Sequence, residues 1–296
     1  MQPKKILVPV DFSSFSEATT RHALEWAHKY KAEVTLFHVI VMYEADVNEE
    51  VHLHQLELLI KSREDEALAK MEQHSNRTNN HDIPVKSVFR RNVSAANAIL
   101  EYIEEEPHDL IIMNTHGKSG LKNLIYGSVT EKVVRLSPIP VLTFHTPPEH
   151  LNIRRILAPV DFSDNSKKGV EIARSIASEH KAKIDVLHTI EQQLHPSFQV
   201  IGIESIFILN PELKQITADK LREFCPANGL DVEYHTIEGP SAPTIVDFAA
   251  EHDTDLIVMA THGYTGLDHL LIGSTTERVV RMAGCPVLTV GRREEA

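Results

Sequence analysis

A run of glycines and hydroxyl side chains stands between an apolar segment and a helical one near the end of the chain. Gly263, Gly266 and Gly273 punctuate residues 255–282, and Ser274 follows the last of them. Glycines let an anion approach the backbone, and a helix N-terminus presents unpaired N–H groups and the positive end of its dipole. These residue types at this spacing predict a site for a phosphate chain.

The same pattern occurs twice. Residues 109–136 and 255–282 align without gaps, and both contain Thr-His-Gly, nine further residues and then Gly-Ser. A second match is upstream, where residues 4–16 read KKILVPVDFSSFS and residues 154–166 read RRILAPVDFSDNS. The chain is therefore predicted to be an internal duplication of a unit of roughly 145 residues, an ordinary size for one domain.

Apolar runs alternate with helical stretches in both copies. We expect strands at residues 5–10, 34–41, 84–89, 109–113 and 140–144 in the first copy, and at 155–159, 183–188, 232–237, 255–259 and 287–290 in the second. Strands that alternate with helices predict parallel crossover units. The sequence thus indicates an α/β protein with a first domain at residues 1–146 and a second at residues 151–296.

An aspartate follows Pro-Val at the end of the first strand in each copy, as Asp11 and Asp161. Proline cannot donate to a sheet ladder, so it is expected near the C-terminal end of its strand, where the ligand crevices of open α/β sheets lie. The aspartate would then face the crevice. Alternatively, it accepts hydrogen bonds from the amides of the turn that precedes the helix.

The serine after the last loop glycine also begins a Ser-x-x-Glu pattern, Ser128 with Glu131 and Ser274 with Glu277. That pattern predicts a capping box, in which the serine hydroxyl accepts from a helix amide and binds no ligand. Capping alone does not explain the Thr-His-Gly loop or the Pro-Val-Asp at another strand end. We therefore favour a phosphate site, most strongly in the second copy.

Paired Pro-Val-Asp-Phe-Ser segments, together with Thr-His-Gly, nine residues and Gly-Ser, resemble the universal stress protein family in its tandem form. The resemblance covers nearly the whole chain. It implies two tandem flavodoxin-like or Rossmann-like α/β domains, each a five-stranded parallel sheet with helices on both faces. It also implies pairing as a dimer or pseudo-dimer through the last strands, and a stress-response role.

The resemblance further implies ATP, with or without Mg²⁺, as the ligand. Glycine and hydroxyl residues would hold the phosphates, the aspartate would meet the ribose or adenine, and apolar residues would line the base pocket. In the second copy these positions are Pro159, Asp161, Thr189, Met259, Ala260, Gly263, Gly273, Ser274 and Thr275. In the first copy, where weaker binding is expected, they are Pro9, Asp11, Val39, Met113, Gly117, Gly127, Ser128 and Val129.

The resemblance also implies a pattern for members that bind ATP, which is Gly-x-x-Gly, nine residues and then Gly-Ser/Thr. Both copies depart from it at its first glycine, which is Asn114 in the first and Ala260 in the second. Alanine adds one methyl group and leaves a close approach open. Asparagine puts an amide side chain where the nucleotide would pass. We expect the second domain to bind ATP, and the first to bind it weakly or not at all.

Composition excludes several classes of function. The formal net charge of −12 opposes a nucleic-acid partner, whose affinity comes largely from basic residues. No apolar run reaches the roughly 18 residues that span a bilayer, and the N-terminus leads directly into a strand, so we expect a cytoplasmic protein with no membrane contact. The two cysteines form no disulfide framework, and the 18 histidines are scattered, so no metal site is expected.

One segment differs between the copies. Residues 192–211 of the second copy are longer and more apolar than the acidic loop at residues 43–50 of the first. An apolar segment of this kind usually marks an interface or a lid, so we expect it to cover a cavity or to pack on another domain or subunit. The alternative is an ordinary packed loop.

The predicted function is a nucleotide-binding regulator, expected to be a homodimer, whose occupancy biases a conformation or a partner contact. The loop has no Walker lysine, and we assign no catalytic residue. His116 and His262 could act in acid–base chemistry, but a histidine before a loop glycine is more often structural. One alternative is a slow ATPase or self-phosphorylating protein, with Ser128, Ser274 or a neighbouring threonine as acceptor. The other is a nucleotide-free interaction protein.

Overall fold

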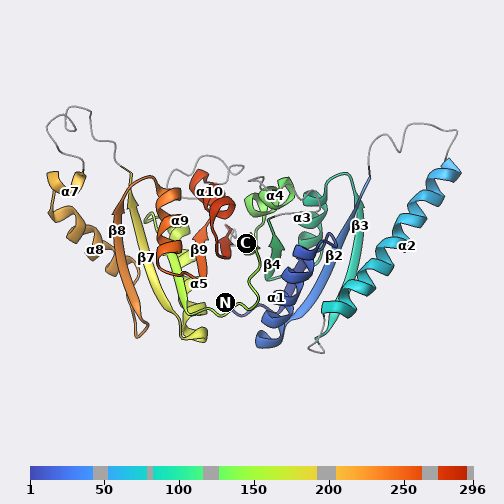
Figure 1. The fold of residues 1–296 in the computed structure, drawn as a ribbon, viewed down its shortest axis with the longest axis horizontal. Helices are drawn as coiled ribbons and strands as arrows, with labels where there is room; N and C mark the ends of the chain where they lie inside the picture. Colours follow the sequence, from blue (N-terminus) through green and yellow to red (C-terminus); the bar gives the residue numbers. More distant parts are fainter. Residues whose placement is uncertain (43–52, 79–82, 116–126, 192–204, 262–272, 292–296) are drawn as a thin grey trace. The chain divides into compact units, whose positions relative to one another are not determined.

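The computed structural model describes residues 1–42, 53–78, 83–115, 127–191, 205–261 and 273–291 (Figure 1). The chain divides into two compact units. One is Gln2–His150, and the other is Leu151–Ala296 together with Met1. Each unit repeats the alternation of strands and helices that the sequence predicts.

The first unit is a five-stranded sheet in the order β3-β2-β1-β4-β5, with parallel neighbours. Its strands are β1 (Lys5–Pro9), β2 (Glu33–Val41), β3 (Val85–Asn92), β4 (Leu110–Asn114) and β5 (Val141–Phe144). Its helices are α1 (Ser14–Tyr30), α2 (Leu53–Thr78), α3 (Ala95–Glu105) and α4 (Ser128–Leu136).

The second unit has the equivalent order β8-β7-β6-β9-β10, again with parallel neighbours. Its strands are β6 (Arg155–Pro159), β7 (Lys183–Ile190), β8 (Val232–Glu238), β9 (Leu256–Ala260) and β10 (Val287–Val290). Its helices are α5 (Asp164–His180), α7 (Ile206–Leu209), α8 (Glu212–Phe224), α9 (Ser241–Glu251) and α10 (Ser274–Met282).

This strand order confirms the prediction of a doubly wound α/β fold. The resemblance implied either a flavodoxin-like or a Rossmann-like winding, and the observed order is the Rossmann-like one. The order reverses between the first and fourth strands of each unit, which are β1 and β4, and β6 and β9. Crossovers leave these two strands toward opposite faces, so a crevice opens at their carboxyl ends. This crevice is where an α/β protein of this class binds ligands.

The apolar strand residues are buried because helices pack against the sheets. In the first unit α1 contacts β1, β4 and α2, whereas α3 contacts β2, β3 and α4. The central strands are apolar throughout, and Ile6, Leu7, Ile111 and Ile112 have no exposed surface. Buried parallel strands read as continuous apolar runs for this reason, which is why the sequence located them well.

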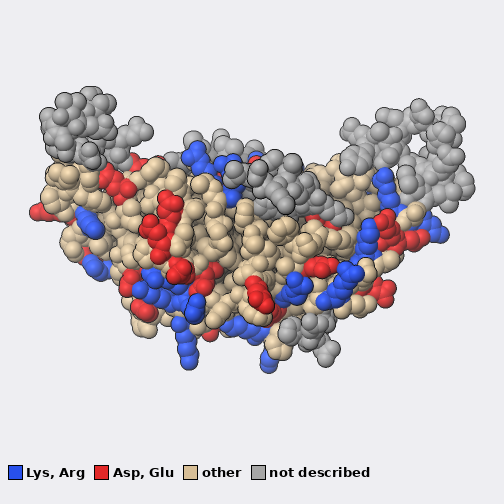
Figure 2. Space-filling model, in the orientation of Figure 1, with Lys and Arg blue, Asp and Glu red and all other residues tan. Residues whose placement is uncertain are grey.

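The surface in Figure 2 carries interspersed acidic and basic side chains, which is typical of a solvated face. Some of them join neighbouring elements: Arg91 of β3 pairs with Glu64 of α2, and Arg77 of α2 pairs with Glu17 of α1. Among the described residues, no helix has both the length and the apolar composition needed to cross a bilayer.

The apolar segment at residues 192–211 is described only from residue 205 onward. Its end forms the short helix α7, in which Ile208 is 60% exposed and Leu209 is 40% exposed. Glu238 at the end of β8 accepts hydrogen bonds from the amide of Ile206 and the hydroxyl of Ser205, and so fixes the start of this helix. The hypothesis that the segment covers a cavity or an interface stays a prediction.

Candidate functional site

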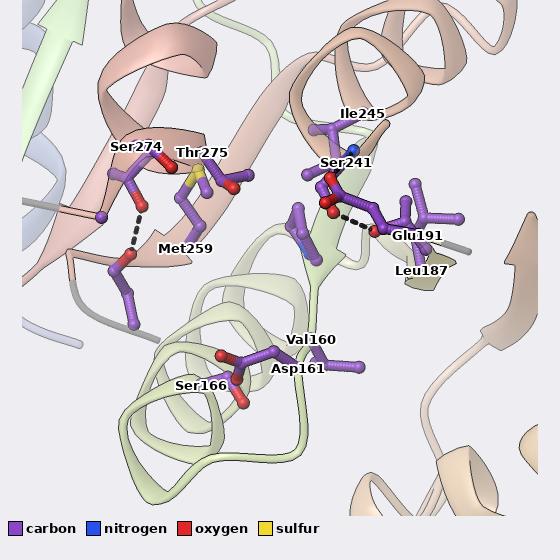
Figure 3. Close-up of a pocket in the computed structure, with 15 residues that line it drawn as sticks. Val160, Asp161, Ser166, Leu187, Glu191, Ser241, Ile245, Met259, Ser274 and Thr275 are labelled. Atoms are coloured by element: carbon purple, nitrogen blue, oxygen red, sulfur yellow. Dashed lines mark hydrogen bonds between the residues drawn. The ribbon is translucent and has the colours of Figure 1, made fainter. Parts of the chain in front are cut away.

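A cavity of about 390 Å³ lies in the second unit at the crevice that the strand order creates (Figure 3). The ends of β6, β7 and β9 form its floor, and the first turns of α9 and α10 form its sides. Its lining residues are Pro159, Val160, Asp161, Ser166, Leu187, Thr189, Glu191, Ser241, Ile245, Met259, Ala260, Gly273, Ser274, Thr275 and Thr276. The structure therefore brings together every predicted site residue of the second copy except Gly263, which lies outside the described residues.

The start of α10 forms one side of the cavity, and the predicted capping box is wrong there. Gly273 is the N-cap, with no side-chain cap, and Ser274 is already the first helical residue. The first intrahelical bond runs from the Glu277 amide to the Gly273 carbonyl at 3.1 Å. The amides of residues 274–276 precede that bond, so they are donors with no acceptor inside the helix.

Two hydrogen bonds anchor this helix start to the last residue of β9 and to the residue that follows it. The Gly273 amide donates to the Thr261 carbonyl at 2.8 Å, and the Thr276 hydroxyl donates to the Ala260 carbonyl at 2.8 Å. Thr276 is buried, whereas Ser274 is exposed. The buried threonine thus ties the helix to the strand end, but it caps none of the helix amides. Ser274 and Thr275 line the cavity with two hydroxyl groups.

Asp161 performs both of the tasks that the sequence left open. Its Oδ1 accepts from the amide of Ser163 at 3.0 Å and from the hydroxyl of Ser163 at 2.6 Å. Ser163 in turn caps α5 by accepting from the Ser166 amide at 3.1 Å. Asp161 also lines the cavity. The hydrogen bonds to Ser163 therefore stabilise the turn and also hold the carboxylate at the cavity.

Phe162 lies between Asp161 and Ser163 in the chain. Its φ is 64°, a left-handed conformation that a bulky residue rarely adopts. Its ring packs against His188 at 4.6 Å between ring centroids, and Nδ1 of His188 donates to the Val160 carbonyl at 2.8 Å. The first unit repeats the arrangement, with Phe12 at 62° against His38. The duplicated Pro-Val-Asp-Phe-Ser segment therefore encodes one rigid strand-to-helix turn.

Glu191 and Ser241 are site residues that the sequence analysis missed. The Glu191 carboxylate accepts from the Ser241 amide, and the Ser241 hydroxyl lies 2.6 Å from that of Thr189. The amide donation lowers the pKa of Glu191 below its ordinary value. These residues are about 50 positions apart, and only the folded sheet brings the end of β7 beside the start of α9, so no local pattern signals them.

The predicted residues of the first unit lie at the corresponding ends of β1, β2 and β4 and at the start of α4. Gly117, like His116 and His262, lies outside the described residues. Gly127 is the N-cap of α4 without a side-chain cap, so the capping box is wrong here too, and Ser128 and Val129 begin the helix. Asp11 holds Ser13 as Asp161 holds Ser163.

The two units differ at the last residue of the fourth strand. Asn114 ends β4 and Ala260 ends β9, and each is 9% exposed. The backbone around them is equivalent, because Thr130 donates to the Asn114 carbonyl as Thr276 donates to that of Ala260. Asparagine is the larger of the two side chains, and the expectation that it takes up space the nucleotide needs in the first unit stays a prediction.

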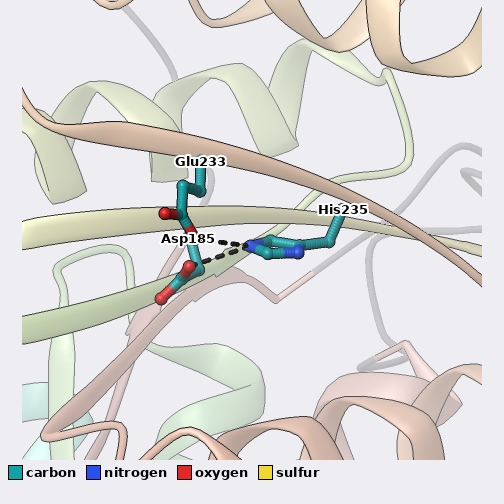
Figure 4. A group of neighbouring side chains, drawn as sticks. All are labelled: Asp185, Glu233 and His235. Carbon is teal, nitrogen blue, oxygen red and sulfur yellow. Dashed lines mark hydrogen bonds and ion pairs between the residues drawn. The ribbon is translucent and has the colours of Figure 1, made fainter. Parts of the chain in front are cut away.

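A cluster of Asp185, Glu233 and His235 has the residue types of a metal site (Figure 4). Its carboxylates are already paired with cations. Arg155 donates to both oxygens of buried Asp185, at 2.5 and 3.1 Å, and Lys183 pairs with Glu233 at 2.5 Å. Hydrogen bonds from His235 and Arg155 outweigh burial and lower the pKa of Asp185 to about 2. The arrangement is an ion-pair network that joins β6, β7 and β8.

Fold and cavity together define a tandem Rossmann-like protein with a ligand crevice at a switch point. Residues 3–145 and 152–291 both match the model of the universal stress protein family. The chain belongs to this family, as the paired motifs predicted, and is a tandem member of it.

Individual relatives agree with this assignment. Universal stress protein MJ0531 of Methanocaldococcus jannaschii is 35% identical over 138 residues, which are 46% of this chain and 81% of that protein. The universal stress protein E homolog of Haemophilus influenzae is 27% identical over 231 residues, 71% of each chain. A solved universal stress protein from Archaeoglobus fulgidus covers 99% of this chain and 97% of its own, with a TM-score of 0.67 and 20% identity. That last likeness shows the fold.

Proposed function

We propose that this chain is a cytoplasmic, ATP-binding stress-response regulator, in which a first domain at residues 1–146 and a second at residues 151–296 divide the work. The second domain binds ATP, with or without Mg²⁺, and its occupancy biases a conformation or a contact with a partner protein. The first domain binds nucleotide weakly or not at all. The assembly proposed is a homodimer built on an intramolecular pseudo-dimer.

The observation that carries the proposal is the start of α10 in the second-unit cavity. Its amides that have no acceptor inside the helix, its two hydroxyls and its dipole end favour an anion, and Gly273 permits close approach of the ligand to the backbone. The rest of the wall is largely apolar, with Val160, Leu187 and Ile245 suited to a flat ring. The volume of about 390 Å³ falls in the range of small-molecule sites.

The lining residues support binding more than turnover. Phosphoryl transfer needs neutralisation of the charge that develops on the phosphate oxygens. Among the described residues that line the cavity, no lysine or arginine is present. A ligand can still act as a switch without being consumed, provided that it binds two states of the protein with different affinity.

A pair of matched substitutions tests the proposal. Gly273 has φ −57° and ψ 130°, and Gly127 has φ −65° and ψ 129°, so valine can adopt the backbone conformation at both positions. A Cβ at Gly127 would lie 3.1 Å from the Thr115 carbonyl oxygen, so thermal unfolding is used to check that both variants are folded. Calorimetric titration of the full chain with ATP and Mg²⁺ should show binding to the wild type and to Gly127→Val. Gly273→Val should lose it, because the branched side chain lies between the ligand and the helix amides. Unchanged ATP affinity in Gly273→Val would overturn the proposal.

A further inference from the structure

The side of the cavity opposite α10 carries a second selective element. We infer that Glu191 makes the cavity accept ligands with an anion at the α10 end only. It favours hydrogen-bond donors at its own end and rejects ligands that carry a second phosphate there. This inference rests on the proposed nucleotide site and specifies which nucleotides that site accepts.

The two sides are distinct in Figure 3, where Ser274 and Thr275 lie across the cavity from Glu191 and Ser241. Donors gather on the α10 side. On the other side, the apolar residues Leu187 and Ile245 lie beside the paired hydroxyls of Thr189 and Ser241, and Glu191 adds a carboxylate to this wall. A ligand held by its phosphate at α10 therefore presents its far end, the sugar or the base, to this carboxylate.

Glu191 is held in place because α9 lacks a capping side chain of its own. Pro240 is the N-cap of α9 and makes no side-chain cap, so the Ser241 amide takes the Glu191 carboxylate as its acceptor. Gly239, which precedes Pro240, has φ 151°, and a Cβ there would come within 2.7 Å of the Thr244 hydroxyl. No capping side chain fits at that position, and the carboxylate arrives from β7 instead.

In the first unit, an asparagine takes the place of the carboxylate as the acceptor for the equivalent serine amide. Asn92 stands where the second unit has Gly239, and its Oδ1 accepts from the Ser94 amide at 3.0 Å. Ser94 caps α3 by accepting from the Asn97 amide. Val41, paired with Asn92 across β2 and β3, occupies the position of Glu191. Of the two equivalent positions, only the one in the second unit therefore carries a carboxylate.

The chemistry of a carboxylate defines the ligands that it selects. It accepts hydrogen bonds from a ribose hydroxyl or an amine, and it repels an anion. Acidic residues in dinucleotide sites select an unmodified ribose over a phosphorylated one in the same way. A phosphate dianion about 6 Å from a carboxylate, in a water-like dielectric, is disfavoured about tenfold, or about 1.4 kcal/mol.

The test compares two ligands that differ by one phosphate. ATP and ATP that carries a 3′-phosphate are titrated into the full chain at low ionic strength, the second by displacement of ATP. The wild type should bind the 3′-phosphorylated ligand about tenfold more weakly. Glu191→Gln keeps an oxygen for the Ser241 amide and removes the charge, so it should bring the two affinities within about threefold while ATP binding persists.

Asp247→Asn is the matched control, since it removes one exposed carboxylate from the same helix without touching the cavity. It should leave the tenfold difference in place. A difference that is absent in the wild type, or that survives in Glu191→Gln, overturns the role of Glu191 while ATP binding and the proposed function stand. Failure of the wild type to bind either nucleotide overturns the proposed function, and this inference with it.

Discussion

Exchanging one residue between the two units tests why only the second is expected to bind ATP. Ala260→Asn puts into the cavity the amide side chain that the first unit carries as Asn114. Both positions are 9% exposed, and both backbones receive the same threonine hydrogen bond, so the exchange changes the side chain and leaves the strand end intact. The perturbation is confined to space that the ligand needs.

The magnitude follows from overfilling a packed site, which typically costs about 1–3 kcal/mol. If the whole of this free energy is lost from ATP binding, the ATP affinity falls by about 5- to 150-fold. Calorimetry on the full chain measures it, and thermal unfolding checks that the variant is folded. The reciprocal variant, Asn114→Ala, should strengthen binding at the first unit and add a second, weaker site to the titration.

A folded Ala260→Asn variant that binds ATP as tightly as the wild type would refute the size argument. So would tighter binding by the wild-type first unit than by the second. Either result would mean that the nucleotide does not pass the end of the fourth strand, and that some other difference between the units decides which one is occupied.

Two further predictions concern the ion-pair network around Asp185 and the turn that carries Asp161. Asp185→Asn should lower stability at pH 7 by about 2 kcal/mol, because the charge that Arg155 holds is lost. The pKa of Asp185 in the folded protein is about 2, below its ordinary value of 3.8. Its contribution to the free energy of unfolding is therefore present above pH 4 and disappears as the pH falls toward 2. Urea unfolding of the wild type and the variant across this range should show the stability difference between them shrink. Ser163→Ala should lower stability by about 1 kcal/mol through the lost cap and weaken ATP binding through the released Asp161. Ser13→Ala, its counterpart in the first unit, should lower stability alone, and an equal loss of ATP affinity in both would contradict the assignment.

The sequence located what depends on local pattern. Strands such as β6 and β10 were predicted to the residue, since short apolar runs between turn residues are buried from both sides. Asp161 was identified because Pro-Val-Asp-Phe-Ser encodes its turn within a few consecutive residues. The linear pattern also located Gly273, although it did not reveal that the helix begins one residue earlier than a capping box requires.

What the sequence did not show depends on contacts between distant segments. Glu191 and Ser241 meet only because β7 and α9 end and begin at the same edge of the sheet. The register of the strands sets the partners of Asp185. Arg155 of β6 lies opposite Lys183 of β7, and Asp185 of β7 lies opposite Glu233 of β8. No spacing along the chain encodes either arrangement, so both had to be read from the folded protein.

The central claim is that this tandem protein binds ATP in its second domain. The most direct measurement denatures the freshly purified full chain, quantifies the released nucleotide per chain by chromatography and mass spectrometry, and titrates nucleotide-free protein with ATP and Mg²⁺. We expect one tightly bound ATP per chain, lost in Gly273→Val and retained in Gly127→Val. No released nucleotide together with no binding of added ATP would contradict it.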